Sequence, residues 1–242
     1  MLDTLFDASS WVALLQIIGV NIVLSGDNAV VIALACRSLP EKERRLGVLF
    51  GSAGAIVLRI ILTFFAVSLL QYPYLKIVGA LLLLWIGIKL LVPEDGYGHG
   101  ISANDNLMAA IRTIIIADLV MSLDNVMGVA AAAKGSIPLI IIGLGISIPI
   151  IIFGSTLIMK IMDRFPSIIT IGGALLGYVA GEMAVTDKGI VGWIEHNVPY
   201  LHMLLPILGA IFVVAVGKWL AKRHESGDQP LVNMAEVPSE RH

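Results

Sequence analysis

Long apolar runs dominate the chain and set its expected architecture. Seven of them are long enough to cross the roughly 30 Å hydrocarbon layer of a membrane as helices. They cover residues 10–35, 46–69, 74–92, 108–132, 137–160, 166–186 and 201–221. The runs do not alternate between apolar and polar positions, as the strands of a membrane barrel do. The pattern predicts an all-α, polytopic membrane protein with seven transmembrane helices.

The amino-acid composition is typical of an integral membrane protein. It is 57% hydrophobic and 14% charged, with a mean hydropathy of +0.91, whereas about a quarter of the residues in soluble domains are charged. The first residues lack the basic segment of a signal peptide, so no cleavage is expected. A single cysteine, Cys36, excludes an intrachain disulfide and a thiolate metal cluster. The bilayer is the expected partner, and nucleic acid is not.

Basic residues are distributed unevenly between the loops, which predicts an orientation. The loop after the first run holds Arg37, Lys42, Arg44 and Arg45, and the segment before Trp11 holds no Lys or Arg. Because cytoplasmic loops carry the excess of Lys and Arg, we expect this loop to be cytoplasmic and the N-terminus to be outside. Seven crossings then place the C-terminus in the cytoplasm. The expected location is the cell (plasma) membrane, which the chain crosses several times.

The chain contains an internal repeat. The first and fourth runs match at an offset of 97, the second and fifth at 92, and the third and sixth at 93. An odd number of spans per repeat places the second repeat upside down, as in many secondary transporters. The expected division is repeat one 10–92, cytoplasmic linker 93–107, repeat two 108–186, outer segment 187–200, seventh helix 201–221 and a disordered cytoplasmic tail 222–242.

Two polar stretches interrupt the first and fourth runs at matching positions. The matched pairs are Asn21 with Asp118, Ser25 with Ser122, Asp27 with Asp124, and Asn28 with Asn125. Carboxylates inside a membrane cost several kcal/mol unless they are compensated. Carboxylate, amide and hydroxyl oxygens suit a hard or borderline divalent ion such as Mn²⁺, Ca²⁺ or Mg²⁺, rather than Zn²⁺ or Cu⁺. The pattern therefore predicts a divalent-cation site and leaves the ion open.

Two further charged residues lie within the runs. Arg59 is near the middle of the second run, where the repeat has Ile151. A buried guanidinium needs a partner, and we expect Asp118, Asp27 or Asp124. Our hypothesis is that Arg59 neutralises the site when no cation is bound. Glu182 is near the outer end of the sixth run, where it either relays protons, lines the exit or touches lipid headgroups.

The segments Ser25-Gly26-Asp27-Asn28 and Ser122-Leu123-Asp124-Asn125 resemble the paired motifs of the TerC family of integral membrane proteins. The resemblance implies manganese export, with Asp27, Asn28, Asp124 and Asn125 as metal ligands and Asn21 and Asp118 beside them. It implies that the ion is cargo rather than a cofactor, that the protein is not an enzyme, and that secretion machinery is a partner. The TerC family is similar in organisation to the LysE exporter superfamily.

Other functions remain open at this stage. An intramembrane aspartyl protease also uses two Asp residues on two helices, but position 24 is Leu where its Gly-x-Gly-Asp signature has Gly. An exporter of a cationic amino acid, suggested by the LysE similarity, would use the same carboxylates. The polar groups could also serve only as hydrogen bonds between helices. The sequence leaves open the coupling ion and whether the protein forms a homo-oligomer.

Overall fold

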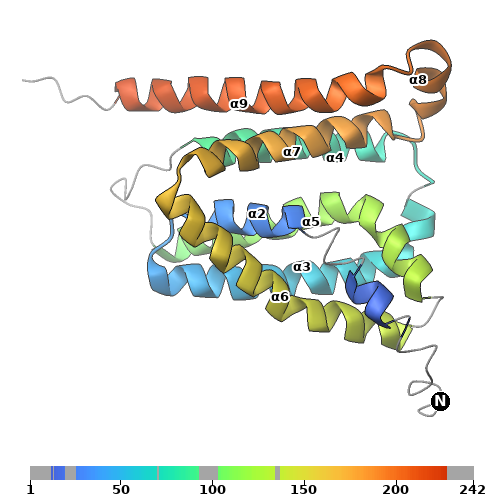
Figure 1. Cartoon of the computed structure of the whole chain (residues 1–242), viewed down its shortest axis with the longest axis horizontal. Helices are drawn as coiled ribbons and strands as arrows, with labels where there is room; N and C mark the ends of the chain where they lie inside the picture. The colour runs from blue at the N-terminus through green and yellow to red at the C-terminus, as the bar shows by residue number, and fades with distance from the viewer. Residues whose placement is uncertain are drawn as a thin grey trace, which may run out of the picture.

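The computed structural model describes residues 12, 14–19, 26–69, 71–92, 103–133 and 137–227, and these residues form helices joined by turns, with no strand among them. Residues 12 and 14–19 are helical. The remaining helices (Figure 1) are α2 (Gly26–Cys36), α3 (Glu41–Leu69), α4 (Leu75–Leu91), α5 (Ala103–Ala133), α6 (Ile137–Arg164), α7 (Ser167–Val185), α8 (Val191–Asn197) and α9 (Leu201–Gly227). The all-α prediction is confirmed for this part of the chain.

Five of the described helices contain a segment that is long and apolar enough to cross a membrane. The segments are Glu41–Phe65, Asn106–Leu123, Pro138–Arg164, Ser167–Val185 and Leu201–Arg223. Helix α4 has 17 residues, and α2 has 11, which gives α2 a length of about 16 Å. Helix α2 alone is therefore about half as long as the hydrocarbon layer is thick.

Several helices extend beyond the apolar runs that predict them. Helix α3 begins at Glu41 rather than at 46, α5 begins at Ala103 inside the expected linker 93–107, and α9 continues to Gly227 inside the expected disordered tail. The apolar runs mark only the part of each helix that suits lipid tails, whereas backbone hydrogen bonding continues into polar turns. In α3, Glu41 and Glu43 lie in the first turn, where acidic side chains stabilise the positive end of the helix dipole.

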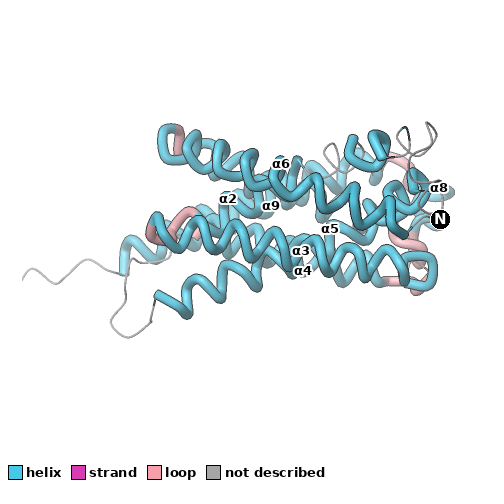
Figure 2. Tube along the Cα trace, turned by 90° about the horizontal axis from the view of Figure 1, so that it is seen from below, coloured by secondary structure: helices cyan, strands magenta, loops and turns pink. Residues whose placement is uncertain are grey.

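The helices stack in layers that run along the length of the molecule. Helix α9 packs on α7 and α4, which also pack on each other. The next layer contains α5, which contacts both α2 and α3, and α6 covers α2 and α3 from the side away from α9 (Figures 1 and 2). This arrangement places the polar residues of α2, α3 and α5 in the interior.

Glycines allow α7 and α9 to approach each other closely. A Cβ atom at Gly177 would clash with the carbonyl oxygen of Gly209, and one at Gly181 would clash with that of Leu205. Both obstacles are backbone atoms, so a side chain at either position would force the helices apart. Small residues at helix contacts are common in membranes because they allow this approach. These glycines therefore serve packing.

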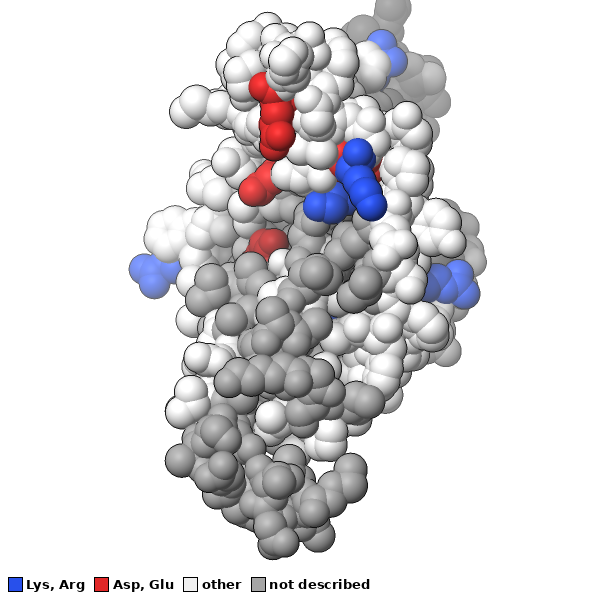
Figure 3. Space-filling model, turned by 90° about the vertical axis from the view of Figure 1, so that its right-hand side faces the viewer, with Lys and Arg blue, Asp and Glu red and all other residues white. Residues whose placement is uncertain are grey.

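A buried carboxylate links the start of α4 to the end of α7, at the end of the molecule that carries α8. Asp187 is 1% exposed and accepts hydrogen bonds from the backbone N–H groups of Tyr74 (2.8 Å), Lys76 (3.0 Å) and Gly189 (2.7 Å). Tyr74, with φ of 66°, precedes α4, so Asp187 fixes the start of α4 to the end of α7. Figure 3 looks onto this end, whose described surface is mostly uncharged. The sequence did not predict this contact.

Candidate functional site

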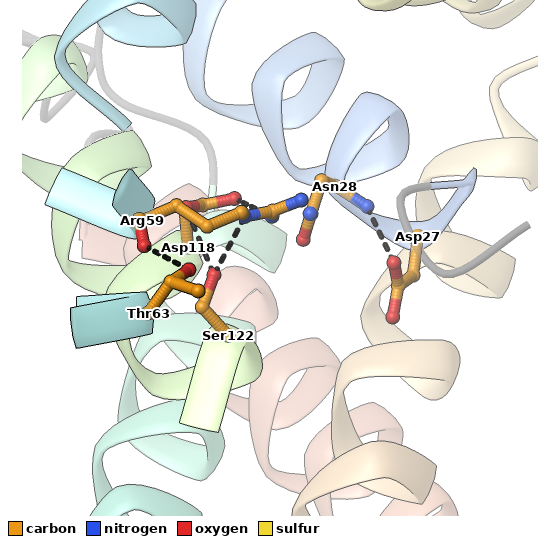
Figure 4. A network of polar contacts seen from close by, with 6 residues as sticks. All are labelled: Asp27, Asn28, Arg59, Thr63, Asp118 and Ser122. Carbon is orange, nitrogen blue, oxygen red and sulfur yellow. Dashed lines mark hydrogen bonds and ion pairs between the residues drawn. The ribbon is translucent and has the colours of Figure 1, made fainter. Parts of the chain in front are cut away.

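Arg59 lies at the centre of a buried polar cluster between α3 and α5 (Figure 4). Its Nη2 donates a hydrogen bond to Asp118 Oδ1 and forms an ion pair with that carboxylate. Its Nε donates to Ser122 Oγ at 2.9 Å. The guanidinium is thus bound to two side chains of one helix face, because residues four apart on a helix share a face.

Ser122 closes this cluster into a ring. Its hydroxyl accepts from Arg59 Nε and donates to Asp118 Oδ2 at 3.1 Å. On α3, the Thr63 hydroxyl donates to the Arg59 carbonyl oxygen at 2.7 Å. The exposed fractions of Arg59, Asp118 and Ser122 are 1%, 6% and 0%. Each charge and hydroxyl in the ring therefore has a protein partner in the interior.

The ring explains how two charges are tolerated at this depth. A buried charge is costly unless it is paired and its hydrogen bonds are satisfied. Arg59 and Asp118 together carry no net charge, and Ser122 binds both. Asp118 is one of the three partners that the sequence predicts for Arg59.

The start of α2 presents a different arrangement. Asp27 is half-buried, and its Oδ1 accepts a hydrogen bond from the backbone N–H of Asn28 at 2.8 Å. Its carboxylate is in the first turn, where the helix dipole favours negative charge. Asn28 is only 4% exposed, yet within the described part of the chain neither its side-chain oxygen nor its side-chain nitrogen has a hydrogen-bond partner. A buried amide without partners costs about 1–3 kcal/mol.

The two arrangements lie in one region of the molecule. Helix α2 packs against α5 and α3, which carry the ring. Asp27 is within Coulombic range of both Arg59 and Asp118. In Figure 4, Asn28 lies between Asp27 and the ring, with its side chain on the side of the Arg59 guanidinium. The packing therefore brings donors from the first and second predicted repeats to one place.

The other predicted site residues divide into three groups. Asn125 is buried, 9% exposed, and lies on the same face of α5 as Asp118. Asp124 belongs to α5, but its side chain, like Asn21 and Ser25, lies outside the described residues. Glu182 is exposed on α7, away from the ring. Within the described part of the chain, no three His, Cys, Asp or Glu residues are grouped closely enough to hold a metal ion.

The Arg59 ring and the start of α2 together provide oxygen atoms that can bind a cation. They offer the carboxylates of Asp27 and Asp118, the amide of Asn28 and the hydroxyl of Ser122. One cation, the guanidinium of Arg59, is already bound to the α5 side. The α2 side retains a buried amide with free hydrogen-bonding capacity.

Comparison with known proteins identifies the family. The model of the integral membrane protein TerC family matches residues 6–225. The chain belongs to the TerC family. The family membership that the sequence predicts is thereby confirmed, and this TerC chain is an integral, multi-pass membrane protein.

Several curated relatives share most of the length of this TerC chain. It is 44% identical over 204 residues to the "uncharacterized membrane protein YjbE" of Bacillus subtilis, covering 84% of this chain and 92% of the relative. It is 26% identical over 245 residues to YkoY of the same organism, covering 90% and 75%. It is 25% identical over 179 residues to the "UPF0053 inner membrane protein YgdQ" of Escherichia coli K12, covering 67% and 75%. No solved structure matches the chain.

Proposed function

We propose that this TerC protein is a membrane transporter that exports a divalent metal cation, with manganese as its ion. The observation that carries the proposal is the buried Asn28 amide, which has no hydrogen-bond partner among the described residues and lies between the Asp27 carboxylate and the Arg59–Asp118 ion pair. A cation bound there would accept the free amide oxygen as a ligand. Oxygen donors of these types are the ones that Mn²⁺, Ca²⁺ and Mg²⁺ prefer. Manganese and the outward direction rest on the TerC resemblance.

The ring supports a mechanism in which Arg59 alternates with the transported ion. In the absence of a divalent ion, the Arg59 guanidinium neutralises Asp118. When the ion binds Asp27, Asn28 and Asp118, it takes over that neutralisation, and Arg59 must withdraw from the carboxylate because both cations cannot occupy the same oxygens. In the empty site the Arg59 and Asp118 charges are then paired with each other, which lowers the free-energy cost of reorienting the site across the membrane. Asp124, Asn125, Asn21 and Ser25 complete the proposed set of polar residues.

We also propose seven spans arranged as two inverted repeats and a final helix. A pair of matching contacts supports the repeats. A Cβ atom at Gly51 would lie 2.6 Å from Ile114 Cδ1, and a Cβ atom at Gly143 would lie 2.5 Å from Ile17 Cγ2. Ile17 corresponds to Ile114 at the offset of 97, and Gly51 to Gly143 at the offset of 92. The second helix of each repeat thus packs against the first helix of the other repeat. Two repeats related by a twofold axis are expected to make such a pair of equivalent contacts.

The proposed orientation follows the distribution of basic residues. Five arginines lie in or directly after the ends of α2, α3, α6 and α9 that are opposite α8 (Figure 1). They are Arg37, Arg44, Arg45, Arg164 and Arg223. The positive-inside rule favours the cytoplasm for this end and the outer side for α8 and the N-terminus.

Flux measurements in proteoliposomes test the proposal. We expect the wild-type protein to move Mn²⁺ and Asp27→Asn, which removes one charge at constant shape, to abolish that movement. Glu195→Gln provides the matched control, because Glu195 is an exposed acid on α8, and it should retain full flux. Equal Mn²⁺ flux in wild type and Asp27→Asn, with both variants folded, would exclude the proposed site.

The same preparation separates the competing functions. Inhibition of Mn²⁺ flux by Ca²⁺ or Mg²⁺ reports the ion preference. Transport of lysine that depends on Asp27, without Mn²⁺ flux, would instead identify a cationic amino acid exporter. We propose a carrier rather than an intramembrane protease. A transmembrane helical peptide added to the same proteoliposomes should therefore not be cleaved.

A further inference from the structure

A cavity of about 850 Å³ lies between the start of α3 and the end of α6. The two helices contact each other, and α6 runs obliquely to α3 (Figure 1). The cavity lies at the end opposite α8 and is separate from the Arg59 ring. Its lining combines a charged rim with an apolar wall. The rim contains Glu41, Arg44, Arg45, Lys160 and Asp163, and the wall includes Val48, Leu49, Ile152 and Met159.

The rim contains one basic group that is fixed and two that are available. Arg44 donates to the carbonyl oxygens of Leu39 (2.9 Å) and Arg37 (2.6 Å) and pairs with Asp163 at 3.1 Å. Arg45 pairs with Glu41 at 3.1 Å, but both side chains are more than 80% exposed, and such surface pairs contribute little. Lys160 is exposed, and none of the described acidic groups pairs with it. Two cations at the mouth can therefore bind an anion.

The apolar wall is exposed to the surroundings of the helices. Leu49, which lines the cavity, is 46% exposed, and two residues of α6 next to lining residues in the sequence, Phe153 and Leu157, are 72% and 49% exposed. These residues belong to the spans Glu41–Phe65 and Pro138–Arg164, so this surface faces lipid tails rather than water. An occupant must be apolar where it contacts Val48 and Ile152, and anionic where it meets Lys160.

We propose that this cavity binds an anionic phospholipid. The phosphate lies between Lys160 and Arg45, and an acyl chain follows Val48 and Ile152 into the bilayer. Basic cavities between transmembrane helices on the cytoplasmic side are suited to anionic headgroups. A free phosphate ion would satisfy the rim but leave the apolar wall uncovered, so the geometry favours the lipid.

Thermal melting of the full-length protein in detergent tests the assignment. We compare phosphatidylglycerol with phosphatidylcholine of the same acyl chains. Phosphatidylglycerol should raise the melting temperature of the wild type by about 3–6 °C at ten times its Kd, and phosphatidylcholine should not. Lys160→Gln and Arg45→Gln should lose this rise. Lys218→Gln should keep it, because Lys218 is an exposed basic residue of α9 outside the cavity.

A second variant tests the apolar part without changing charge. Thr156 is exposed and lines the cavity, so Thr156→Trp should fill the space and also remove the rise. Equal stabilisation of the wild type and Lys160→Gln would overturn the proposal, and so would equal loss in Lys218→Gln, which would indicate non-specific charge attraction. Stabilisation of the wild type by inorganic phosphate to the same extent would overturn the choice of a lipid.

Discussion

The Asp118–Ser122 turn of α5 and the Asp27–Asn28 turn of α2 lie in one polar region, but their polar groups are satisfied very differently. On α5, Arg59 binds Asp118 and Ser122, and Ser122 also binds Asp118. On α2, the Asn28 amide is buried and has no hydrogen-bond partner in the part of the chain that the structure describes. One half of the region is therefore closed by the protein's own cation, and the other half retains capacity for a ligand.

An unmatched arginine contributes to this difference. Arg59 is on α3, and the matching position on α6 is Ile151, which is buried and apolar. The second repeat therefore supplies no guanidinium to the α2 motif. The two turns therefore differ in whether a guanidinium lies beside them. The variants below test how far that inequality accounts for stability and ion binding, in order of their expected effect on the metal-free protein.

Removal of the guanidinium should have the largest effect. Arg59→Met keeps the length and apolar character of the side chain but leaves the Asp118 carboxylate buried without its cation. Breaking a buried ion pair in this way costs about 3–5 kcal/mol. We expect that loss in the free energy of unfolding, measured in mixed micelles with a chelator present. Added Mn²⁺ should restore part of it.

The double variant Arg59→Met/Asp118→Asn provides the control. It removes both charges, so no buried charge is left uncompensated, and it should be more stable than Arg59→Met alone. If the double variant were as unstable as the sum of the two single variants, the pair would not be coupled. The comparison of the two turns would then lose its electrostatic basis.

Sequence patterns predict much of this arrangement. The length of the apolar runs predicts the membrane helices, and the need of a buried guanidinium for a partner predicts that Arg59 meets an intramembrane carboxylate. The choice of Asp118 depends on how α3 is rotated against α5, and no local pattern encodes that rotation. The free amide of Asn28 is equally a product of packing, because an Asn in a membrane helix usually finds a partner.

The unpredicted elements lie at the ends of the helices. The early start of α3 at Glu41 has a local signal, since Pro40 and two acidic residues in the first turn favour a helix N-terminus, but the search for apolar runs does not detect it. Asp187 has no comparable signal. Its three backbone donors come from two segments more than 100 residues apart in the sequence, so only the fold shows its role.

Loss of the bridging hydroxyl should have the next largest effect. Ser122→Ala removes the acceptor of Arg59 Nε and a donor to Asp118 but preserves the ion pair. Leaving buried groups without a hydrogen bond costs about 1–3 kcal/mol. We expect a destabilisation in that range by the same unfolding measurement. A change close to zero would show that the ring needs only its charges.

A substitution beside the ring should have a smaller effect. Thr63→Val keeps the shape of the side chain and removes only the hydrogen bond from its hydroxyl to the Arg59 carbonyl oxygen. A single net hydrogen bond contributes about 0.5–1.5 kcal/mol. Because neither charged group loses a partner, the loss should be at the lower end of this range. A loss as large as that of Ser122→Ala would mean that Thr63 positions the arginine.

The smallest effect on the metal-free protein is expected at the α2 turn. Asn28→Ala removes an amide that none of the described residues hydrogen-bonds. The gain from no longer burying this amide offsets the loss of packing, so the free energy of unfolding should change by less than about 1 kcal/mol. The response to Mn²⁺ should change much more. At 100 times Kd, an ion stabilises the wild type by about 2.7 kcal/mol, and Asn28→Ala should lose most of that stabilisation.

Ser52 supplies the matched control for this last variant. Ser52 is also buried, 1% exposed, and its hydroxyl has no hydrogen-bond partner among the residues described. It lies on α3 about two turns from Arg59. Ser52→Ala should therefore leave both the metal-free stability and the Mn²⁺ response unchanged. If both variants reduced the Mn²⁺ response equally, a buried polar atom without a partner would not by itself mark a ligand. If only Asn28→Ala reduced it, the incomplete turn of α2 would be the half of the region that the cation completes.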